Sequence, residues 1–126
     1  MTRINVVPPS ELCDQHLLAE FRELTRIPNG VLYGKFKRDY PDRPTNYTLG
    51  EGHVKFFTDK LTWLYNRYNE LTYECRKRGF NIIPKFPQVH ESKINPWRPT
   101  EADMLVNRQR IAERMPKRAR WHGKEI

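Results

Sequence analysis

Hydrophobic residues recur every three or four positions in three stretches of this chain, a spacing that predicts three amphipathic α-helices. The first helix is expected over residues 11–26, with Ser10 as its N-cap. Pro28 and the Asn29-Gly30 pair are expected to end it. Its core-facing positions are Cys13, Leu17, Phe21 and Leu24, and the other side carries Gln15, Ala19, Arg22 and Arg26.

The second predicted helix begins between His53 and Thr58 and runs to Arg78. Gly79 follows three basic residues and is a typical C-terminal stop. The apolar stripe of this helix comprises Phe57, Leu61, Leu64, Tyr65, Tyr68, Leu71 and Cys75.

The third predicted helix covers residues 101–115 and ends before Pro116. Thr100 and Asp103 have the spacing of a capping box at its start. Its apolar positions include Met104, Leu105, Ile111 and Met115. Proline-rich stretches at 28–48 and 82–99 are expected to form long loops between the helices. The pattern therefore predicts one compact all-α domain over residues 1–126, with the N-terminal segment, stiffened by Pro8-Pro9, between the helices.

Charge indicates the kind of partner. The 126 residues include 23 Lys and Arg against 15 Asp and Glu, a net charge of +8, which favours a polyanion. There is no membrane-length apolar run and no signal peptide, so we expect no membrane partner and a cytoplasmic, unsecreted protein. We also expect a monomer. Because the basic residues are interleaved with Trp and Tyr, nucleic acid is the better candidate than an anionic membrane.

Metal and cofactor chemistry is not expected. Cys13 and Cys75 fall within predicted helices and are best interpreted as small buried residues. The chain has no C-x-x-C pattern, and its four histidines, at 16, 53, 90 and 122, lack the spacing of metal ligands. We therefore predict no metal and no organic cofactor.

The residue after the start methionine is a candidate nucleophile. A start Met followed by a small residue is normally removed, which would leave the free α-amine of Thr2. An α-amine titrates near ~7.7–8.0, below lysine, so part of it is unprotonated and nucleophilic at neutral pH. A carboxylate on a nearby helix is the natural partner for such an amine.

Two blocks of residues resemble a known family. The first comprises residues 1–5, 10–12, 14–17, 19–20 and 22–24, and the second comprises 49–50, 52–54, 56–57, 59–61, 74–75 and 77–81. Both resemble phage-type endonuclease V, the pyrimidine-dimer DNA glycosylases with AP lyase activity. The resemblance implies that the Thr2 amine attacks C1′ of the damaged nucleotide, displaces the base and forms an imine, after which β-elimination breaks the strand. It implies that Glu23 stabilises the cationic sugar and moves protons.

The resemblance also implies contacts with double-stranded DNA that contains a damaged base. Arg22 and Arg26, one turn apart, are expected to hold phosphates together with Arg3. The match is looser after residue 104, where a basic pair is followed by a shortened aromatic tail. The DNA-binding candidates are Arg3, Gln15, His16, Arg22, Arg26, Arg110, Arg114, Trp121 and Lys124.

Two alternatives remain open at this point. One is a related glycosylase and lyase for another damaged or modified base, because residues 28–48 and 82–99 diverge from the family. The other is a non-catalytic, basic, helical DNA-binding protein, in which Glu23 would be an ordinary solvated helix residue and the arginines a solvated basic face. Trapping of a covalent adduct with borohydride separates the enzymes from the binder, and a panel of lesions separates the two enzymes.

Overall fold

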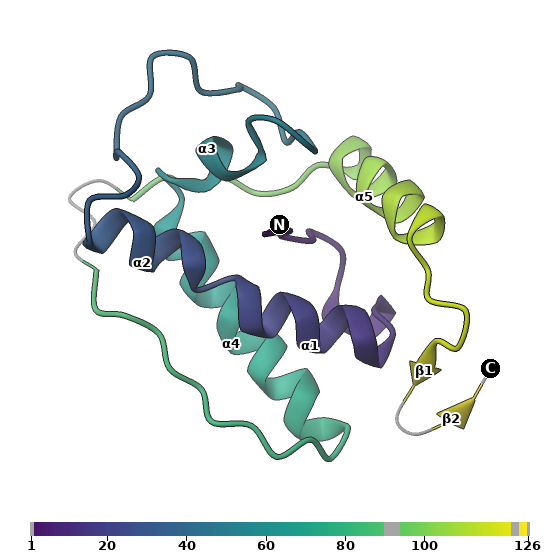
Figure 1. Ribbon diagram of the computed structural model, residues 1–126. Coiled ribbons are helices and arrows are strands. Elements are labelled where there is room, and N and C mark those ends of the chain that lie inside the picture. The colour runs from purple at the N-terminus through teal and green to yellow at the C-terminus, as the bar shows by residue number, and fades with distance from the viewer. Residues whose placement is uncertain (1, 90–93, 122–123, 126) are drawn as a thin grey trace.

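The computed structural model describes residues 2–89, 94–121 and, for the main chain alone, 124–125. The elements in chain order are η1 (Pro9–Glu11), α1 (Asp14–Glu23), α2 (Arg26–Leu32), α3 (His53–Phe57), α4 (Leu61–Lys77), α5 (Glu101–Glu113), β1 (Arg120–Trp121) and β2 (Lys124–Glu125) (Figure 1).

The helices surround the N-terminal segment. α1 packs against α4, and α5 lies on the other side of the segment that leads from the N-terminus to η1 (Figure 1). The only strands among the described residues are β1 and β2, which pair as a short antiparallel hairpin. This arrangement confirms the all-α prediction, including the N-terminal segment between the helices. Within the described residues, no helix is both long and apolar enough for a membrane span.

The start of the first helix differs from the prediction. Residues 9–11 form the single 3₁₀ turn η1, and Leu12 has extended backbone angles. The α-helix begins at Asp14 after Cys13, so the prediction of Ser10 as its N-cap was wrong. The reason lies in packing, because Leu12 and Cys13 are both fully buried, and the extended step between the two helical turns places them in the core.

The end of the first helix also differs, because Pro28 lies in the first turn of a second helix, α2, rather than after the end of the first. Pro28 has no N–H to donate to the Leu24 carbonyl, and Ile27 N donates to that oxygen instead, at 3.2 Å. This tighter step separates α1 from α2, which then tolerates Pro28 in its first turn. Gly30 lies inside α2 because the Phe36 ring packs where its Cβ would be, 2.3 Å away.

The second predicted helix is divided into α3 and α4 at Lys60. The backbone of Lys60 leaves the helical region, with φ −122° and ψ 41°. Its buried ammonium donates to the Phe56 carbonyl at 2.8 Å and to Asp59 Oδ1 at 2.8 Å. A lysine that bonds the last carbonyls of a helix stabilises that end of it. The break therefore depends on a side chain that folds back onto α3.

The predicted end of α4 and the predicted start of α5 are confirmed. Gly79 has φ 87°, and the amides of Gly79 and Phe80 donate to the carbonyls of Arg76 and Cys75, which is a Schellman motif. At α5, Asp103 N donates to Thr100 Oγ1 at 3.1 Å, and Thr100 N donates to Asp103 Oδ2 at 2.9 Å. This reciprocal pair is the predicted capping box.

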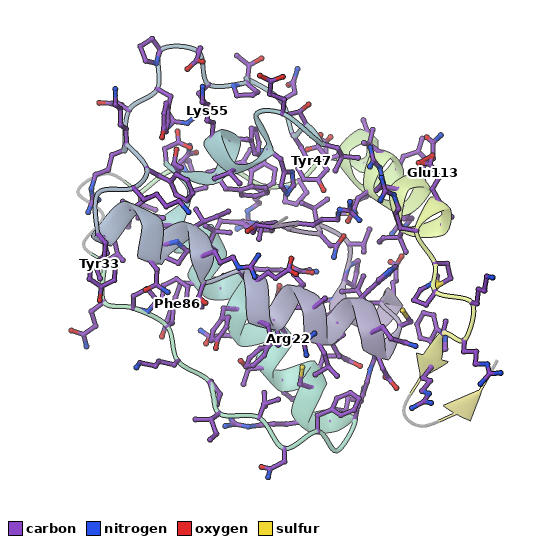
Figure 2. All side chains as sticks on the ribbon, in the orientation of Figure 1. Arg22, Tyr33, Tyr47, Lys55, Phe86 and Glu113 are labelled. Atoms are coloured by element: carbon purple, nitrogen blue, oxygen red, sulfur yellow. The ribbon has the colours of Figure 1, made fainter. Side chains whose placement is uncertain are left out.

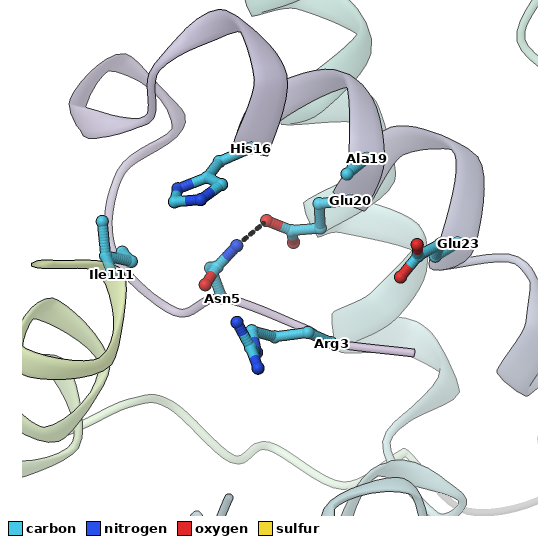
Figure 3. A pocket seen from close by; sticks show the side chains of 7 residues that line it. All are labelled: Arg3, Asn5, His16, Ala19, Glu20, Glu23 and Ile111. Carbon is cyan, nitrogen blue, oxygen red and sulfur yellow. Dashed lines mark hydrogen bonds between the residues drawn. The ribbon is translucent and has the colours of Figure 1, made fainter. Parts of the chain in front are cut away.

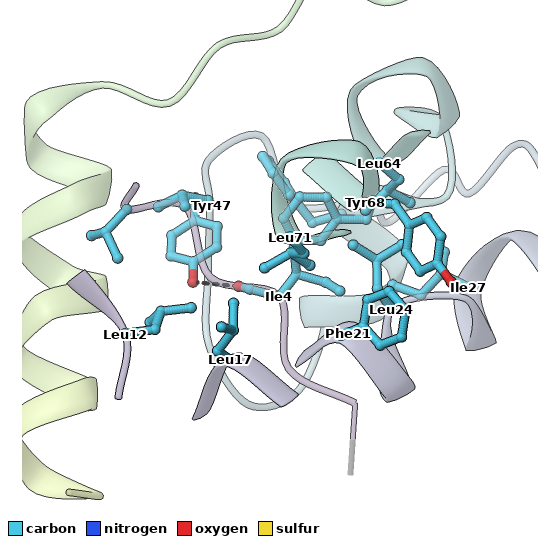
Figure 4. Close-up of a cluster of buried hydrophobic side chains, with 14 of the residues drawn as sticks. Ile4, Leu12, Leu17, Phe21, Leu24, Ile27, Tyr47, Leu64, Tyr68 and Leu71 are labelled. Carbon is cyan, nitrogen blue, oxygen red and sulfur yellow. Dashed lines mark hydrogen bonds between the residues drawn. The ribbon is translucent and has the colours of Figure 1, made fainter. Parts of the chain in front are cut away.

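Most predicted core positions are buried, including the whole stripe of the first helix, of which Figure 4 shows Leu17, Phe21 and Leu24. Three predictions were wrong: Tyr65 is 49% exposed, Leu105 67% and Met115 40%. On α5 the reason is that Asn107, not an apolar residue, is fully buried between Met104 and Ile111. α5 therefore faces the interior with a polar side chain, and the functional site explains why.

Candidate functional site

One face of α1 lines a pocket of about 200 Å³ (Figure 3). His16, Ala19, Glu20 and Glu23 recur at helical spacing and lie on this face. Arg3 and Asn5 of the N-terminal segment and Ile111 of α5 complete the lining. The predicted carboxylate, Glu23, is therefore half-buried in a pocket with a cationic side chain beside it.

A second, smaller pocket of about 70 Å³ adjoins the first, because Arg3 lines both. The other residues that line it are Thr2, Leu49, Gly50, His53, Arg110 and Arg114. The structure thus brings the predicted nucleophile, Thr2, and the predicted carboxylate, Glu23, to neighbouring pockets on either side of Arg3. Met1 lies outside the described residues.

The second pocket is strongly cationic. Burial lowers the pKa of Arg3 from its ordinary value, and the nearby guanidinium groups of Arg110 and Arg114 lower it further. The Glu23 carboxylate opposes this change in the Arg3 pKa, so the four charged groups are within electrostatic reach of one another. Arg110 also approaches Glu113 at 3.7 Å, which neutralises part of this charge. Such a cluster attracts an anion such as a phosphate.

Side chains hold the N-terminal segment in place, because no neighbouring strand is there to do so. Ile4 N donates to His53 Nε2 at 2.8 Å, and Tyr47 Oη donates to Ile4 O at 2.9 Å (Figure 4). The Asn107 carboxamide oxygen accepts from Val6 N at 2.7 Å and from Val7 N at 3.2 Å. These bonds satisfy backbone groups that would otherwise be buried without partners.

The bonds of His53 define its tautomer. Its Nε2 accepts a hydrogen bond from the Ile4 amide, so Nδ1 carries the ring hydrogen and donates to Thr48 O at 2.7 Å. This geometry requires a neutral imidazole. Burial lowers the pKa of His53, and the hydrogen bond to Thr48 partly opposes that change. Arg3 and Glu20 also influence the His53 pKa, and the Tyr47 ring packs edge-on against it.

The two carboxylates of the first pocket have different surroundings. Glu20 is 2% exposed and is bound by Arg67 at 2.8 and 2.9 Å and by Asn5 Nδ2 at 2.9 Å. Asn107 Nδ2 donates to Asn5 Oδ1 at 2.8 Å, which links this network to α5. The Glu23 side chain makes no hydrogen bond or ion pair with another described residue. The Glu20 carboxylate is therefore bound by partners within the fold, whereas the Glu23 carboxylate is available to a ligand.

The predicted phosphate ligands Arg22 and Arg26 are both exposed, and Arg22 projects from α1 (Figure 2). They lie on α1 and α2 respectively, so the prediction of one uninterrupted helix turn between them was wrong. Arg114 is also exposed and lines the smaller pocket. Arg22 and Arg26 line neither pocket, so the structure brings Arg3, Arg110 and Arg114 together at the site and leaves Arg22 and Arg26 outside its lining.

Gln15 and His16 contact the C-terminal tail. Gln15 Nε2 donates to Arg118 O at 2.7 Å, and Arg120 N donates to Gln15 Oε1 at 3.0 Å. The Gln15 carboxamide thus bonds two backbone groups of the tail, as the main chain of a neighbouring strand would. His16 Nε2 lies 3.1 Å from Arg114 O. Trp121 packs over the Arg78 guanidinium, 5.8 Å from the ring centroid. The Lys124 side chain lies outside the described residues.

Sequence reasoning missed the buried polar residues that support the site: Asn5, Glu20, Tyr47, His53, Arg67 and Asn107. A signal was present for three of them. Glu20, Arg67 and Asn107 each fall in phase with an apolar stripe, where a solvated residue is not expected. A polar residue in such a position indicates a buried partner, although it does not identify that partner.

In residues 2–89 and 94–121, no three His, Cys, Asp or Glu side chains are placed to hold a metal ion. Cys13 and Cys75 are free and buried, and burial raises the pKa of the Cys75 thiol to about 11. That thiol is therefore unreactive at neutral pH.

Comparison with known families places the chain. The family described as pyrimidine dimer DNA glycosylase matches residues 1–88, which is more than half of the chain. The match includes Thr2, Arg3, α1 with Glu23, α3 with His53 and α4 with Arg67, and it ends before α5. The chain therefore belongs to the pyrimidine dimer DNA glycosylase family, whose members are DNA repair glycosylases.

Proposed function

We propose that this protein excises cyclobutane pyrimidine dimers from double-stranded DNA and then cleaves the strand, using the α-amine of Thr2 as nucleophile and Glu23 as the catalytic carboxylate. One observation carries the proposal: Thr2 and Glu23 line adjoining pockets that share Arg3, at the end of a segment held by buried side chains. Membership of the family supports the substrate class.

The proposed chemistry has two stages. The neutral amine attacks C1′, and the electron pair of the glycosidic bond leaves with the base. The attached amine then loses one proton, and ring opening breaks the C1′–O4′ bond, with O4′ taking up a proton. The product is a protonated imine, which acidifies the C2′ proton. Removal of that proton expels the 3′ phosphate by β-elimination. The Glu23 carboxylate stabilises the positive charge that develops on the sugar and exchanges protons with it.

The arginines have a separate role in this proposal. Arg3, Arg110 and Arg114 surround the pocket that contains Thr2, where they would hold a phosphate beside the reacting sugar. The exposed Arg22 and Arg26 would hold phosphates farther along the strand. Because base and sugar are hidden inside duplex DNA, these contacts would also stabilise the distorted helix that exposes them.

The direct test is covalent trapping. Borohydride should trap an adduct on duplexes that contain a dimer or an abasic site, and Edman sequencing of the adduct should be blocked at Thr2. Intact mass must first establish that Met1 has been removed. A protein with one extra, uncleaved residue before Thr2 is the matched control and should trap slowly. An adduct that maps to a lysine, or equal trapping by the extended protein, would contradict the assignment of the nucleophile.

A relative specific for another damaged base is the second candidate. The observation that favours it is the end of the family match at residue 88, which leaves α5 and the hairpin outside. Turnover on duplexes with different single lesions tests it. A higher kcat/KM on a duplex with another lesion than on the dimer duplex would support this candidate. The proposed chemistry of Thr2 would be unaffected by that result.

A further inference from the structure

We propose that His53 and Tyr47 act as a clamp on the main chain of Ile4, and that this clamp positions the N-terminal amine for attack. The inference rests on the proposed function, because it concerns the placement of the Thr2 nucleophile. His53 and Tyr47 are positioning residues here, since each acts through Ile4 and is not required to touch the substrate.

The clamp forms a hydrogen bond with each of the two backbone groups of Ile4. His53 Nε2 accepts from the Ile4 amide at 2.8 Å, and Tyr47 Oη donates to the Ile4 carbonyl at 2.9 Å. Ile4 itself is fully buried, and its side chain lies in the hydrophobic core. Because both backbone groups and the side chain of Ile4 are held, Ile4 cannot shift along the direction of the chain. Only Arg3 separates it from Thr2, so the amine can sample a small volume.

The clamp residues are themselves fixed. His53 Nδ1 donates to Thr48 O at 2.7 Å, and its ring packs edge-on against Phe57, with centroids 5.4 Å apart. The Tyr47 ring packs edge-on against His53, Phe56 and Phe57. His53 also lines the small pocket that contains Thr2. The positions of both rings are therefore set by α3 and the loop before it, which do not belong to the N-terminal segment.

Placement of a nucleophile matters because a displacement of about 1 Å can reduce a rate about 10²-fold. His53→Phe removes the acceptor and retains an aromatic ring of similar size. His53→Gln restores an acceptor for the Ile4 amide. Tyr47→Phe removes only the hydroxyl on the opposite side. Tyr68→Phe is the control, because its hydroxyl accepts from Lys85 N at 2.9 Å, away from the N-terminal segment.

Three measurements are made on each full-length variant: the single-turnover rate of borohydride trapping on an abasic duplex, the affinity for that duplex, and ¹⁵N relaxation of the Arg3 amide. We expect His53→Phe to trap about 10- to 100-fold more slowly, with affinity within about threefold of wild type and a mobile Arg3 amide. Tyr47→Phe should also slow trapping and make the Arg3 amide more mobile. His53→Gln should recover most of the rate, and Tyr68→Phe should match wild type.

A folded His53→Phe protein with wild-type trapping and a rigid Arg3 amide would overturn the proposal, and so would equal losses of rate and affinity. If His53→Phe does not fold, Tyr47→Phe decides by the same criteria. If the wild-type protein forms no adduct at all, the proposed function fails. The relaxation of Arg3 in the variants still determines whether the clamp orders the N-terminus.

Discussion

Replacement of Glu20 and of Glu23 by Gln should separate stability from catalysis, although the two carboxylates line one pocket three residues apart on α1. Glu20 forms a two-pronged ion pair with Arg67, whose side chain is 2% exposed. Glu20→Gln keeps the shape but leaves the buried guanidinium without its counterion. Breaking a buried pair in this way costs about 3–5 kcal/mol, a large share of the ~5–15 kcal/mol that a small domain has.

Glu23→Gln should behave in the opposite way. Glu23 is half-buried and has no hydrogen-bonded or ion-paired partner among the described residues, so the free energy of unfolding should stay within about 0.5 kcal/mol of wild type. Loss of a carboxylate that stabilises charge and moves protons should lower turnover by about 10²- to 10⁴-fold. Affinity for undamaged DNA should change little, because we propose that the arginines make the phosphate contacts.

Urea unfolding and single-turnover nicking of dimer-containing DNA measure the two effects. With a slope of about 2 kcal/mol per M, Glu20→Gln should lower the unfolding midpoint by roughly 1.5–2.5 M. Under conditions in which it is folded, it should retain most of its nicking rate. The reasoning fails if Glu23→Gln is destabilised as much as Glu20→Gln, or if folded Glu20→Gln loses as much activity as Glu23→Gln.

The remaining predictions concern the DNA surface, pH and packing. Arg22→Ala and Arg26→Ala should each flatten the log–log salt dependence of DNA affinity by about one unit. Arg108→Ala should not, because the Arg108 guanidinium is bound to Glu11 at 2.8 Å. Unchanged slopes for all three variants would argue against DNA contacts by Arg22 and Arg26. The pKa of His53 is lowered, so its contribution to stability is full above its unfolded pKa of ~6.5 and is lost as pH falls toward its folded pKa, by up to about 1.4 kcal/mol per unit. Unfolding at pH 5–7 should therefore depend less on pH in His53→Gln than in wild type. Gly30→Ala should destabilise by about 1–3 kcal/mol, measured by urea unfolding, because its Cβ would lie 2.3 Å from an aromatic ring.

The helices were predictable where local signals determine them. The capping box of Thr100 and Asp103 and the glycine stop at Gly79 depend on residues adjacent in sequence, and both are confirmed. The breaks between α1 and α2 and between α3 and α4 were not predictable from such local signals. Pro28 is compatible with both the end of one helix and the first turn of the next. Only the distribution of hydrogen bonds around the Leu24 carbonyl distinguishes these two outcomes.

The candidate site was predictable in a different way. Thr2 and Glu23 followed from the resemblance and from the chemistry of an α-amine, and periodicity alone would have treated Glu23 as solvated. Arg67 and Asn107 were not identified, because their partners lie at sequence separations of 47 and of 100 or more residues. A single sequence shows that a polar residue falls in phase with a core stripe. It does not show which distant backbone group that residue satisfies.

The buried polar residues follow from one structural requirement. An extended segment in the centre of an all-α protein has no neighbouring strand, so its amides and carbonyls need side-chain partners or remain unsatisfied at a cost of about 1–3 kcal/mol each. His53, Tyr47, Asn107 and Arg67 together bond five backbone groups of residues 4–7. Apolar residues at these four positions would not allow the segment to pass through the core. The polar core is thus the condition under which the N-terminal segment can pass beside the Glu23 face of α1, and loss of the His53 or Tyr47 anchor should affect the placement of Thr2 before it affects the helices.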